Sequence, residues 1–195
     1  MAVENIDQLV AEVRSCSACD GLPLGPKPIF QMRSTARILI AGQAPGRITH
    51  HKGRPFDDPS GDRLRDWMGI DREIFYDAAK IAILPMGFCF PGTGKGGDLP
   101  PRPECAALWR KRLLAQLPDL ETTLVIGRYA LDWHLGGQQS STVRDTVANW
   151  RQYWPEVLPM PHPSPRNNRW LRDNRWFVAD VVPTLQNHIG HLLGS

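Results

Sequence analysis

The stretch that decides the fold is residues 36–46, which read ARILIAGQAPG. Residues 36–41 form a short apolar run with two isoleucines, which is typical of a buried strand in a parallel sheet. The run ends in residues 42–46 (GQAPG), where glycine and proline predict a compact loop at the carboxyl end of that strand. Open α/β sheets bind their ligands at this end, so the loop is a candidate site.

The rest of the chain alternates between similar apolar runs and helical patterns. Further strands are predicted at residues 80–84, 124–126 and 158–162, with a Gly/Pro-rich loop over 85–103. Helices are predicted at residues 4–15, 103–117, 129–135 and 176–193, and Ser60 is expected to cap a helix ending near residue 69. This alternation predicts an α/β fold: one domain over residues 1–195, with three α/β/α layers around a mostly parallel four-stranded sheet.

Composition restricts the class of protein without naming one. The 195 residues are 42% hydrophobic and 22% charged, as in ordinary globular proteins. No stretch reaches the roughly 20 apolar residues that span a bilayer, and the start lacks the order of a secretory signal. We therefore expect a cytoplasmic monomer with no membrane partner. The net charge of +3 suits a polyanionic partner but does not identify it.

Four cysteines form two separated pairs. Cys16 and Cys19 make a C-x-x-C motif, and fifteen residues lie between Cys89 and Cys105. Structural disulfides are rare in a reducing compartment, so a metal site is the more informative hypothesis. Four thiolates can hold zinc or a [4Fe–4S] cluster, and the spacing alone does not choose between them.

Two loops carry unusual chemistry. Residues 42–61 (GQAPGRITHHKGRPFDDPSG) contain Phe56, whose ring among polar residues is expected to stack on something, beside two carboxylates and two imidazoles. Residues 162–167 read HPSPRN, where two prolines predict a stiff turn that holds His162 in place. After it, arginines recur every third residue at 166, 169, 172 and 175, as either a solvated helix face or a phosphate-contacting surface.

In order along the chain, these pieces resemble the uracil-DNA glycosylase superfamily, and most closely its iron–sulfur branch, families 4 and 5. The matching pieces are Cys16/Cys19, GQAPG at 42–46, GRPF at 53–56, Cys89/Cys105 and HPSP at 162–165. The resemblance implies a [4Fe–4S] cluster on Cys16, Cys19, Cys89 and Cys105, with a structural role. Zinc stays as the alternative.

The resemblance also implies a function. The chain would be a monofunctional hydrolase that cleaves the N-glycosidic bond of uracil, or a related deaminated or damaged base, and so begins base excision repair of DNA. His162 would donate a hydrogen bond to uracil O2, Phe56 would stack on the flipped base, and Gln43 with the Ala44 backbone would line the uracil edge or hold water. Flipping costs least in single-stranded or mispaired DNA, the expected partner.

The chain departs from the family pattern in the first loop. Gln43 stands where the iron–sulfur relatives usually carry glutamate, and Ala44 where family 1 carries its catalytic aspartate. Asp57 is then the nearest carboxylate that could activate water, with His50 a weaker candidate. Residues 84–88 also lack the uracil-reading asparagine of the relatives, so base selectivity is either looser or read by the backbone.

The segment after HPSP is the predicted contact with DNA. Arg166, Asn167 and Arg169 are expected to bind the strand, and Trp170 with Leu171 to wedge into the duplex. The alternative is that Trp170 and Leu171 form the core face of a short helix.

Other functions remain open. A silent member of the same fold could bind uracil or abasic DNA without cleaving it, which the missing carboxylates favour. Covalent capture of an abasic sugar by a side chain is known in one branch of the superfamily, which carries a basic loop ending in histidine. Residues 162–169 (HPSPRNNR) lack the pattern of that loop, so this function fits less well. A redox protein is the third option, although phosphate-loop and Rossmann glycine patterns are both missing.

Overall fold

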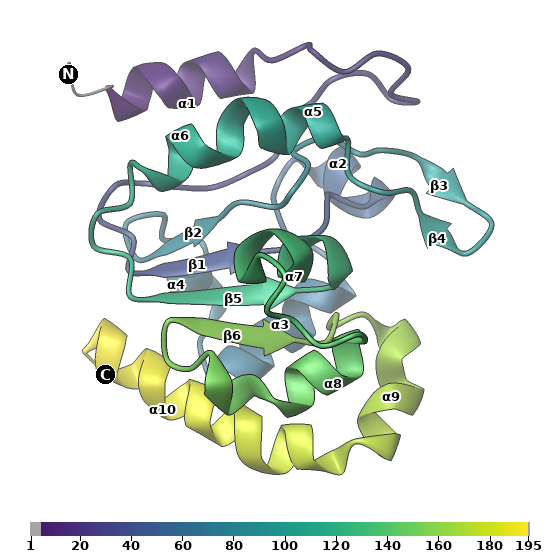
Figure 1. Cartoon of the computed structure of the whole chain (residues 1–195). Helices are drawn as coiled ribbons and strands as arrows, with labels where there is room; N and C mark the ends of the chain where they lie inside the picture. Colours follow the sequence, from purple (N-terminus) through teal and green to yellow (C-terminus); the bar gives the residue numbers. More distant parts are fainter. Residues whose placement is uncertain (1–4, 195) are drawn as a thin grey trace.

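A computed structural model describes residues 5–194, and its centre is a four-stranded sheet. The strands are β1 (Ile38–Ala41), β2 (Ile81–Ile83), β5 (Thr122–Ile126) and β6 (Val157–Met160). Their order is β2-β1-β5-β6, and every neighbouring pair is parallel. All four arrows therefore point to the same edge in Figure 1. The predicted parallel sheet is confirmed.

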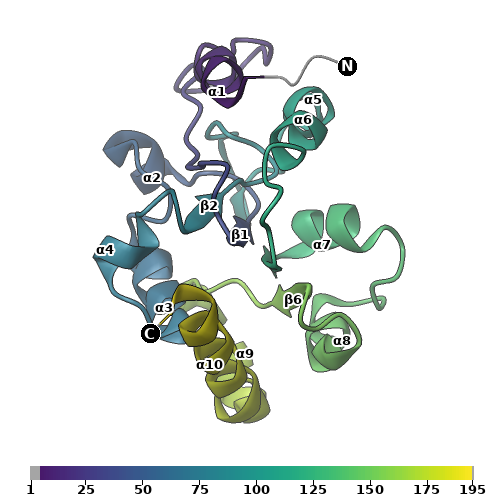
Figure 2. The ribbon, with the colours of Figure 1, turned by 90° about the vertical axis from the view of Figure 1, so that its left-hand side faces the viewer.

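Helices cover both faces of the sheet, as Figure 2 shows. On one face, Ile38 and Ile40 pack in a core cluster with α3 (Pro59–Met68) and α10 (Val182–Leu193). On the other face, Leu39 packs with α1 (Ile6–Arg14) and α6 (Lys111–Leu114), while Ala41 packs with α7 (Arg128–Leu135). Alternate strand residues therefore serve opposite layers, and the predicted α/β/α architecture is confirmed.

The remaining elements are short. They are the helices α2 (Arg47–Lys52), α4 (Arg72–Phe75), α5 (Pro103–Cys105), α8 (Val143–Ala148) and α9 (Asn168–Asp173), π-helical turns at Ala106–Arg110 and Phe177–Val181, 3₁₀ turns at Trp150–Gln152 and Pro165–Asn167, and a hairpin of β3 (Thr93–Gly94) and β4 (Gly97–Asp98). No helix within residues 5–194 is long and apolar enough to cross a membrane.

Three local predictions were wrong. Asp58, not Ser60, caps α3, accepting the Gly61 N–H at 2.9 Å, and the helix begins at Pro59. Residues 85–103 contain the β3–β4 hairpin, whose two-residue strands are too short to show a periodic pattern. The helices expected over 103–117 and 176–193 each contain a π-helical turn and have different bounds.

Backbone pairing between β1 and β2 continues past the ends of these strands. Met86 N–H donates to the Gly42 carbonyl at 2.8 Å, and Gly87 N–H donates to the Gln43 carbonyl at 3.0 Å. Arg110, which is fully buried at the end of the π-helical turn after α5, donates from Nη1 to the carbonyls of Leu84 (3.0 Å) and Pro85 (3.2 Å). The GQAPG loop is therefore fixed to the segment that follows β2.

The turn between α2 and α3 is unusually close-packed. Phe56 has a φ of 54°, the left-handed region that side chains rarely adopt, and no other non-glycine residue described here does so. Its carbonyl lies against the backbone of Gly61, where a Cβ atom would be 1.7 Å from the Phe56 oxygen. Only glycine at position 61 leaves room for this carbonyl.

We expect Gly61→Ala to lower the free energy of unfolding by about 2 kcal/mol or more, the usual cost of overpacking a tight site. In an ordinary helix position the same change stabilises by roughly 1 kcal/mol, so the sign itself is informative. Urea denaturation of wild type, Gly61→Ala and the control Gly96→Ala, whose new Cβ meets nothing within 4 Å, measures it. A Gly61→Ala protein as stable as wild type would contradict this packing.

Candidate functional site

The two chemically unusual loops lie at the same edge of the sheet. The GQAPG loop follows β1 and the HPSPRN loop follows β6, both at the carboxyl ends that point toward the hairpin and α9 in Figure 1. A parallel sheet brings such loops together whatever their separation in the sequence. The edge is therefore the candidate active site.

His162 is held in one tautomer. The Ser164 N–H donates to His162 Nδ1 at 3.1 Å, so the ring proton of the neutral imidazole resides on Nε2. Burial lowers the pKa of His162 below its usual value, an effect that the carboxylates of Asp58 and Asp98 partly offset. The ring is therefore neutral at physiological pH and offers Nε2–H as a hydrogen-bond donor.

The turn that carries His162 is braced from two sides. Asn167 Nδ2 donates to the His162 carbonyl at 2.7 Å, so the amide predicted to contact DNA also holds the turn. Arg63 on α3 donates to the Ser164 carbonyl at 3.0 Å and to Asn168 Oδ1 at 2.7 Å. Arg63 was missed by sequence reasoning, because nothing in its local pattern marks it.

Phe56 stands beside the first loop. A Cβ atom on Gly42 would lie 3.4 Å from Phe56 Cζ, so the ring lies against the bare backbone of the GQAPG loop. The ring also meets Phe75 edge-on, with centroids 6.4 Å apart, and stays half-buried. The left-handed turn therefore fixes an aromatic surface next to the loop, as stacking on a base would require.

Gln43 is hydrogen-bonded to the end of the β3–β4 hairpin. Its Nε2 donates to the Leu99 carbonyl at 3.0 Å, just past β4. A glutamate at this position could not donate, and its carboxylate would face a carbonyl oxygen. Ala44, next in the loop, is half-buried and offers only its backbone to a ligand.

Asp57 is held by two cations. It pairs with Arg72 at 2.8 Å and with Lys52 at 3.3 Å, and its side chain is only 18% exposed. The hydrogen bond from Arg72 lowers the pKa of Asp57, partly opposed by burial, and a carboxylate stabilised in this way is a weaker base. His50, the weaker candidate, is buried on α2 and packs near Phe90, with a ring-centroid distance of 6.2 Å.

Asp98, on β4, was not anticipated from the sequence. Its carboxylate acts electrostatically on His162, and a Cβ atom on Gly46 would lie 3.1 Å from its Oδ2. The surrounding residues 92–97 are mostly glycine, so the sequence shows no signal that this aspartate reaches the site.

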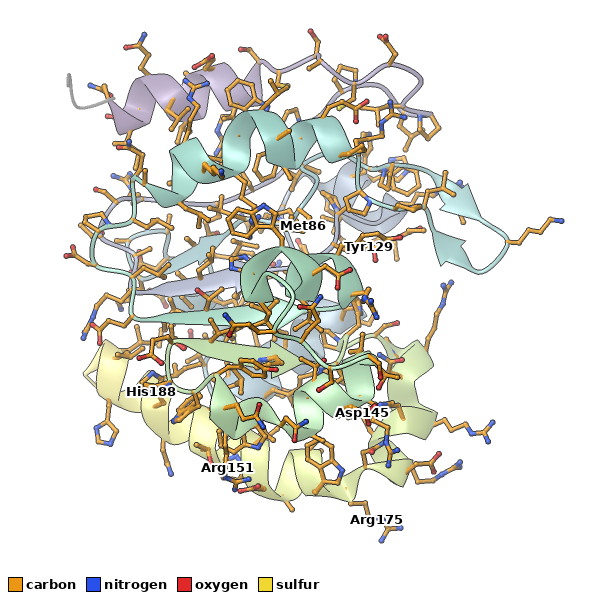
Figure 3. All side chains as sticks on the ribbon, in the orientation of Figure 1. Met86, Tyr129, Asp145, Arg151, Arg175 and His188 are labelled. Carbon is orange, nitrogen blue, oxygen red and sulfur yellow. The ribbon has the colours of Figure 1, made fainter. Side chains whose placement is uncertain are left out.

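The predicted wedge packs into the protein. Trp170 is half-buried, with its ring 5.9 Å from Phe177 and 6.0 Å from Trp176, and Leu171 joins the same core cluster. This packing favours the alternative that both residues form the core face of α9. Of the basic residues, Arg169 is 86% exposed and only 3.8 Å from Asp173, and Arg175 points away from the protein in Figure 3.

The carboxyl edge also presents an exposed aromatic ring. Tyr129 lies at the start of α7, directly after β5, and is 39% exposed (Figure 3). Met86, labelled in the same figure, is buried and packs against α7 from the segment after β2.

All four cysteines line one pocket between the segment after α1 and the start of α5. Three sulfurs accept N–H groups at 3.3 Å: Cys16 from Trp109 Nε1, Cys89 from the Lys27 backbone and Cys105 from the Phe88 backbone. Hydrogen bonds to sulfur are one of the means by which proteins tune iron–sulfur clusters. The two cysteine pairs, far apart in the sequence, therefore lie around one pocket.

The four cysteines are a donor set that metals take. Burial, reinforced by the other sulfurs, raises the pKa of Cys105 to about 12, so thiolates here require a bound cation. Over residues 5–194, no group of three or more His, Cys, Asp or Glu side chains is arranged to hold a metal ion. Four thiolates are the donor set of both structural zinc and a [4Fe–4S] cluster, so the chemistry of the four cysteines fits either group.

The family model of the uracil DNA glycosylase superfamily matches residues 30–186, and the chain belongs to that superfamily. The match spans both loops, β1 through β6 and the start of α10.

Individual relatives agree with this assignment. The chain is 28% identical over 134 residues to the type-4 uracil-DNA glycosylase of Archaeoglobus fulgidus, covering 66% of this chain. The chain spans 62% of the length of that relative. The solution NMR structure of a Methanosarcina acetivorans protein with a provisional uracil DNA glycosylase name has a TM-score of 0.52 at 15% identity, covering 85% of this chain and 98% of that one. It supports the fold alone.

Proposed function

We propose that this chain is a DNA-repair glycosylase that hydrolyses the N-glycosidic bond of uracil, or of a related deaminated base, in DNA. The observation that carries the proposal is the fixed His162 tautomer, with Nε2–H free at the carboxyl edge of the sheet. The proposal treats the chain as one monofunctional glycosylase domain.

His162 would act on the leaving group. As the bond between C1′ and N1 breaks, negative charge develops on the ring oxygens of uracil. A neutral Nε2–H that donates to O2 stabilises this charge more in the transition state than in the substrate, and one such donor is worth roughly 3 kcal/mol. A neutral imidazole also leaves Nδ1 able to keep its bond from Ser164.

Phe56 and the first loop would hold the flipped base. The Phe56 ring offers an apolar surface against Gly42, and the Ala44 backbone with the free oxygen of the Gln43 amide can meet the base edge. Extracting a base costs a few kcal/mol, least where it is unpaired, which supports single-stranded or mispaired DNA as substrate. Arg166 and Arg169 are exposed at this edge for phosphate contact.

A second candidate is a protein that recognises uracil or abasic DNA without cleaving it. The observation in its favour is the first loop, where Gln43 and Ala44 supply no carboxylate and Asp57 is paired with Arg72 and Lys52. Stabilisation of the leaving group alone still lowers the barrier, so this arrangement does not exclude catalysis.

We also propose that Cys16, Cys19, Cys89 and Cys105 hold a [4Fe–4S] cluster. Such a cluster would supply cross-linking through four metal–thiolate bonds. The cysteines belong to two separate parts of the chain. Cys16 and Cys19 follow α1, and Cys89 and Cys105 are the first and last residues of the segment 89–105. Joining them would fix the N-terminal helix to α5 and to the loop that carries the hairpin.

For the cluster, we expect protein purified without oxygen to contain about four irons and four sulfides per chain, with visible absorption. Cys89→Ala should lose most of this iron and unfold at a lower temperature. The control is Ser17→Ala, at an exposed position next to Cys16, which should keep the iron content and the melting temperature of wild type. Metal analysis and thermal melting measure both. One equivalent of zinc and no iron would contradict the proposal.

For His162, we expect His162→Ala to slow single-turnover excision from a single-stranded oligonucleotide with one uracil by about 10²–10³-fold, because the donor to the leaving group is lost. Binding of the same strand should change far less. The exposed His191→Ala is the matched control and should keep the wild-type rate.

Wild-type protein that binds the uracil strand tightly and never cleaves it would overturn the enzymatic proposal and favour the second candidate. Abasic sites are revealed by alkaline cleavage. Equal rates for wild type and His162→Ala would mean that another group stabilises the leaving base.

A further inference from the structure

A glycosylase needs a group that deprotonates water, and the GQAPG loop has no carboxylate for this role. Gln43 is an amide engaged with Leu99, Ala44 has no polar side chain, and Asp57 is neutralised by two cations. The remaining carboxylates that act on His162 are Asp58 and Asp98. Asp58 is committed to the N-cap of α3, where Oδ1 accepts the Gly61 N–H.

Asp98 has no such commitment. Within residues 5–194, the only hydrogen bond of the Asp98 side chain is a long one, 3.4 Å, from Thr93 Oγ1, and this side chain takes part in no ion pair there. The side chain is exposed in the free protein. Its Oδ2 nevertheless lies over the end of the GQAPG loop, 3.1 Å from where a Gly46 Cβ would be. A residue with a side chain at 46 would press on this carboxylate.

The hairpin that carries Asp98 is hydrogen-bonded to one site loop and lies against the other. Leu99 N–H donates to the Gly92 carbonyl at 2.9 Å, closing the hairpin, and the Leu99 carbonyl accepts from Gln43 Nε2 at 3.0 Å. On the other side, a Cβ atom on Gly97 would lie 3.2 Å from Arg166 Nη1, which belongs to the HPSPRN turn. Asp98 is therefore held between the loop of the base and the loop of the catalytic histidine.

We propose that Asp98, delivered by the β3–β4 hairpin, is the carboxylate that activates water in the glycosylase reaction. The inference rests on the function proposed above. Water oxygen bonds to C1′ as the C1′–N1 bond breaks, and the bonding pair leaves with the base, spread onto O2 opposite His162 Nε2–H. The proton released by the water passes to the Asp98 carboxylate and then to solvent.

The anchoring amide explains why the hairpin can take this role. Gln43 donates to the residue next to Asp98, and a carboxylate at 43 would lose that bond. The Gln43 amide therefore holds the segment that carries Asp98 beside the GQAPG loop. Asp98 lies on an exposed glycine-rich hairpin, so bound DNA is expected to cover it and exclude bulk water.

The test is single-turnover excision of uracil from a single strand by wild type, Asp98→Asn and Asp119→Asn. Asp119 is an exposed aspartate between α6 and β5, at the opposite edge of the sheet, and its variant removes the same charge. Asp98→Asn should slow excision by about 10²-fold or more, the usual loss with a general base. Asp119→Asn should keep the wild-type rate.

Binding and folding separate a catalytic role from a structural one. Asp98→Asn should have the melting temperature of wild type, because the side chain is exposed. It should bind the uracil strand as tightly as wild type or more tightly, because a negative charge near phosphate is removed. Excision at the wild-type rate by Asp98→Asn would overturn the inference while leaving the glycosylase proposal intact, and loss of excision in Asp57→Asn instead would assign the water to Asp57. No excision by wild type would overturn both.

Discussion

The hydrogen bond from the Ser164 N–H to His162 Nδ1 is the contact on which the functional account depends. It removes one ring nitrogen from the chemistry and fixes the proton on the other. The prolines on each side of Ser164 stiffen the turn, and Arg63 and Asn167 hold its carbonyls. Burial keeps the pKa of the ring low, so the imidazole enters the reaction neutral. The same arrangement would serve a protein that only recognises the base, which is why the water-activating group matters.

The parallel sheet explains how distant segments reach this histidine. Strand ends gather the GQAPG and HPSPRN loops at one edge, and backbone pairing beyond β1 and β2 fixes the first loop to residues 84–87. Phe56 is then set against Gly42 by a left-handed turn that depends on the absence of a side chain at Gly61. The cysteine pocket lies outside this edge. Two of its cysteines, Cys89 and Cys105, stand at the two ends of the chain segment that contains the β3–β4 hairpin. The cysteine pocket and the candidate active site are thus joined through residues 89–105.

Sequence reasoning predicted the sheet, the layers and the convergence of both loops, because buried strands and proline turns leave strong local patterns. The resemblance to the superfamily also predicted that the four cysteines share one metal site. Sequence reasoning could not predict the hairpin, whose strands have two residues each, or the role of Asp98 within a run of glycines. Asp58, and not Ser60, caps α3. Both residue types are good N-caps, so the sequence alone does not show which of the two begins the helix. Trp170 had two interpretations from the sequence, and its contacts with Phe177 and Trp176 favour packing.

The most direct test of the central claim is the protonation state of His162 itself. Nitrogen-15 NMR of the imidazole rings, with His162 assigned by loss of its signals in His162→Gln, distinguishes the two neutral tautomers from imidazolium. At neutral pH the account predicts a proton on Nε2 alone, and this state should persist below the usual histidine pKa of about 6.5. A proton on Nδ1, or an imidazolium at neutral pH, would contradict the hydrogen bond from Ser164 and the role derived from it.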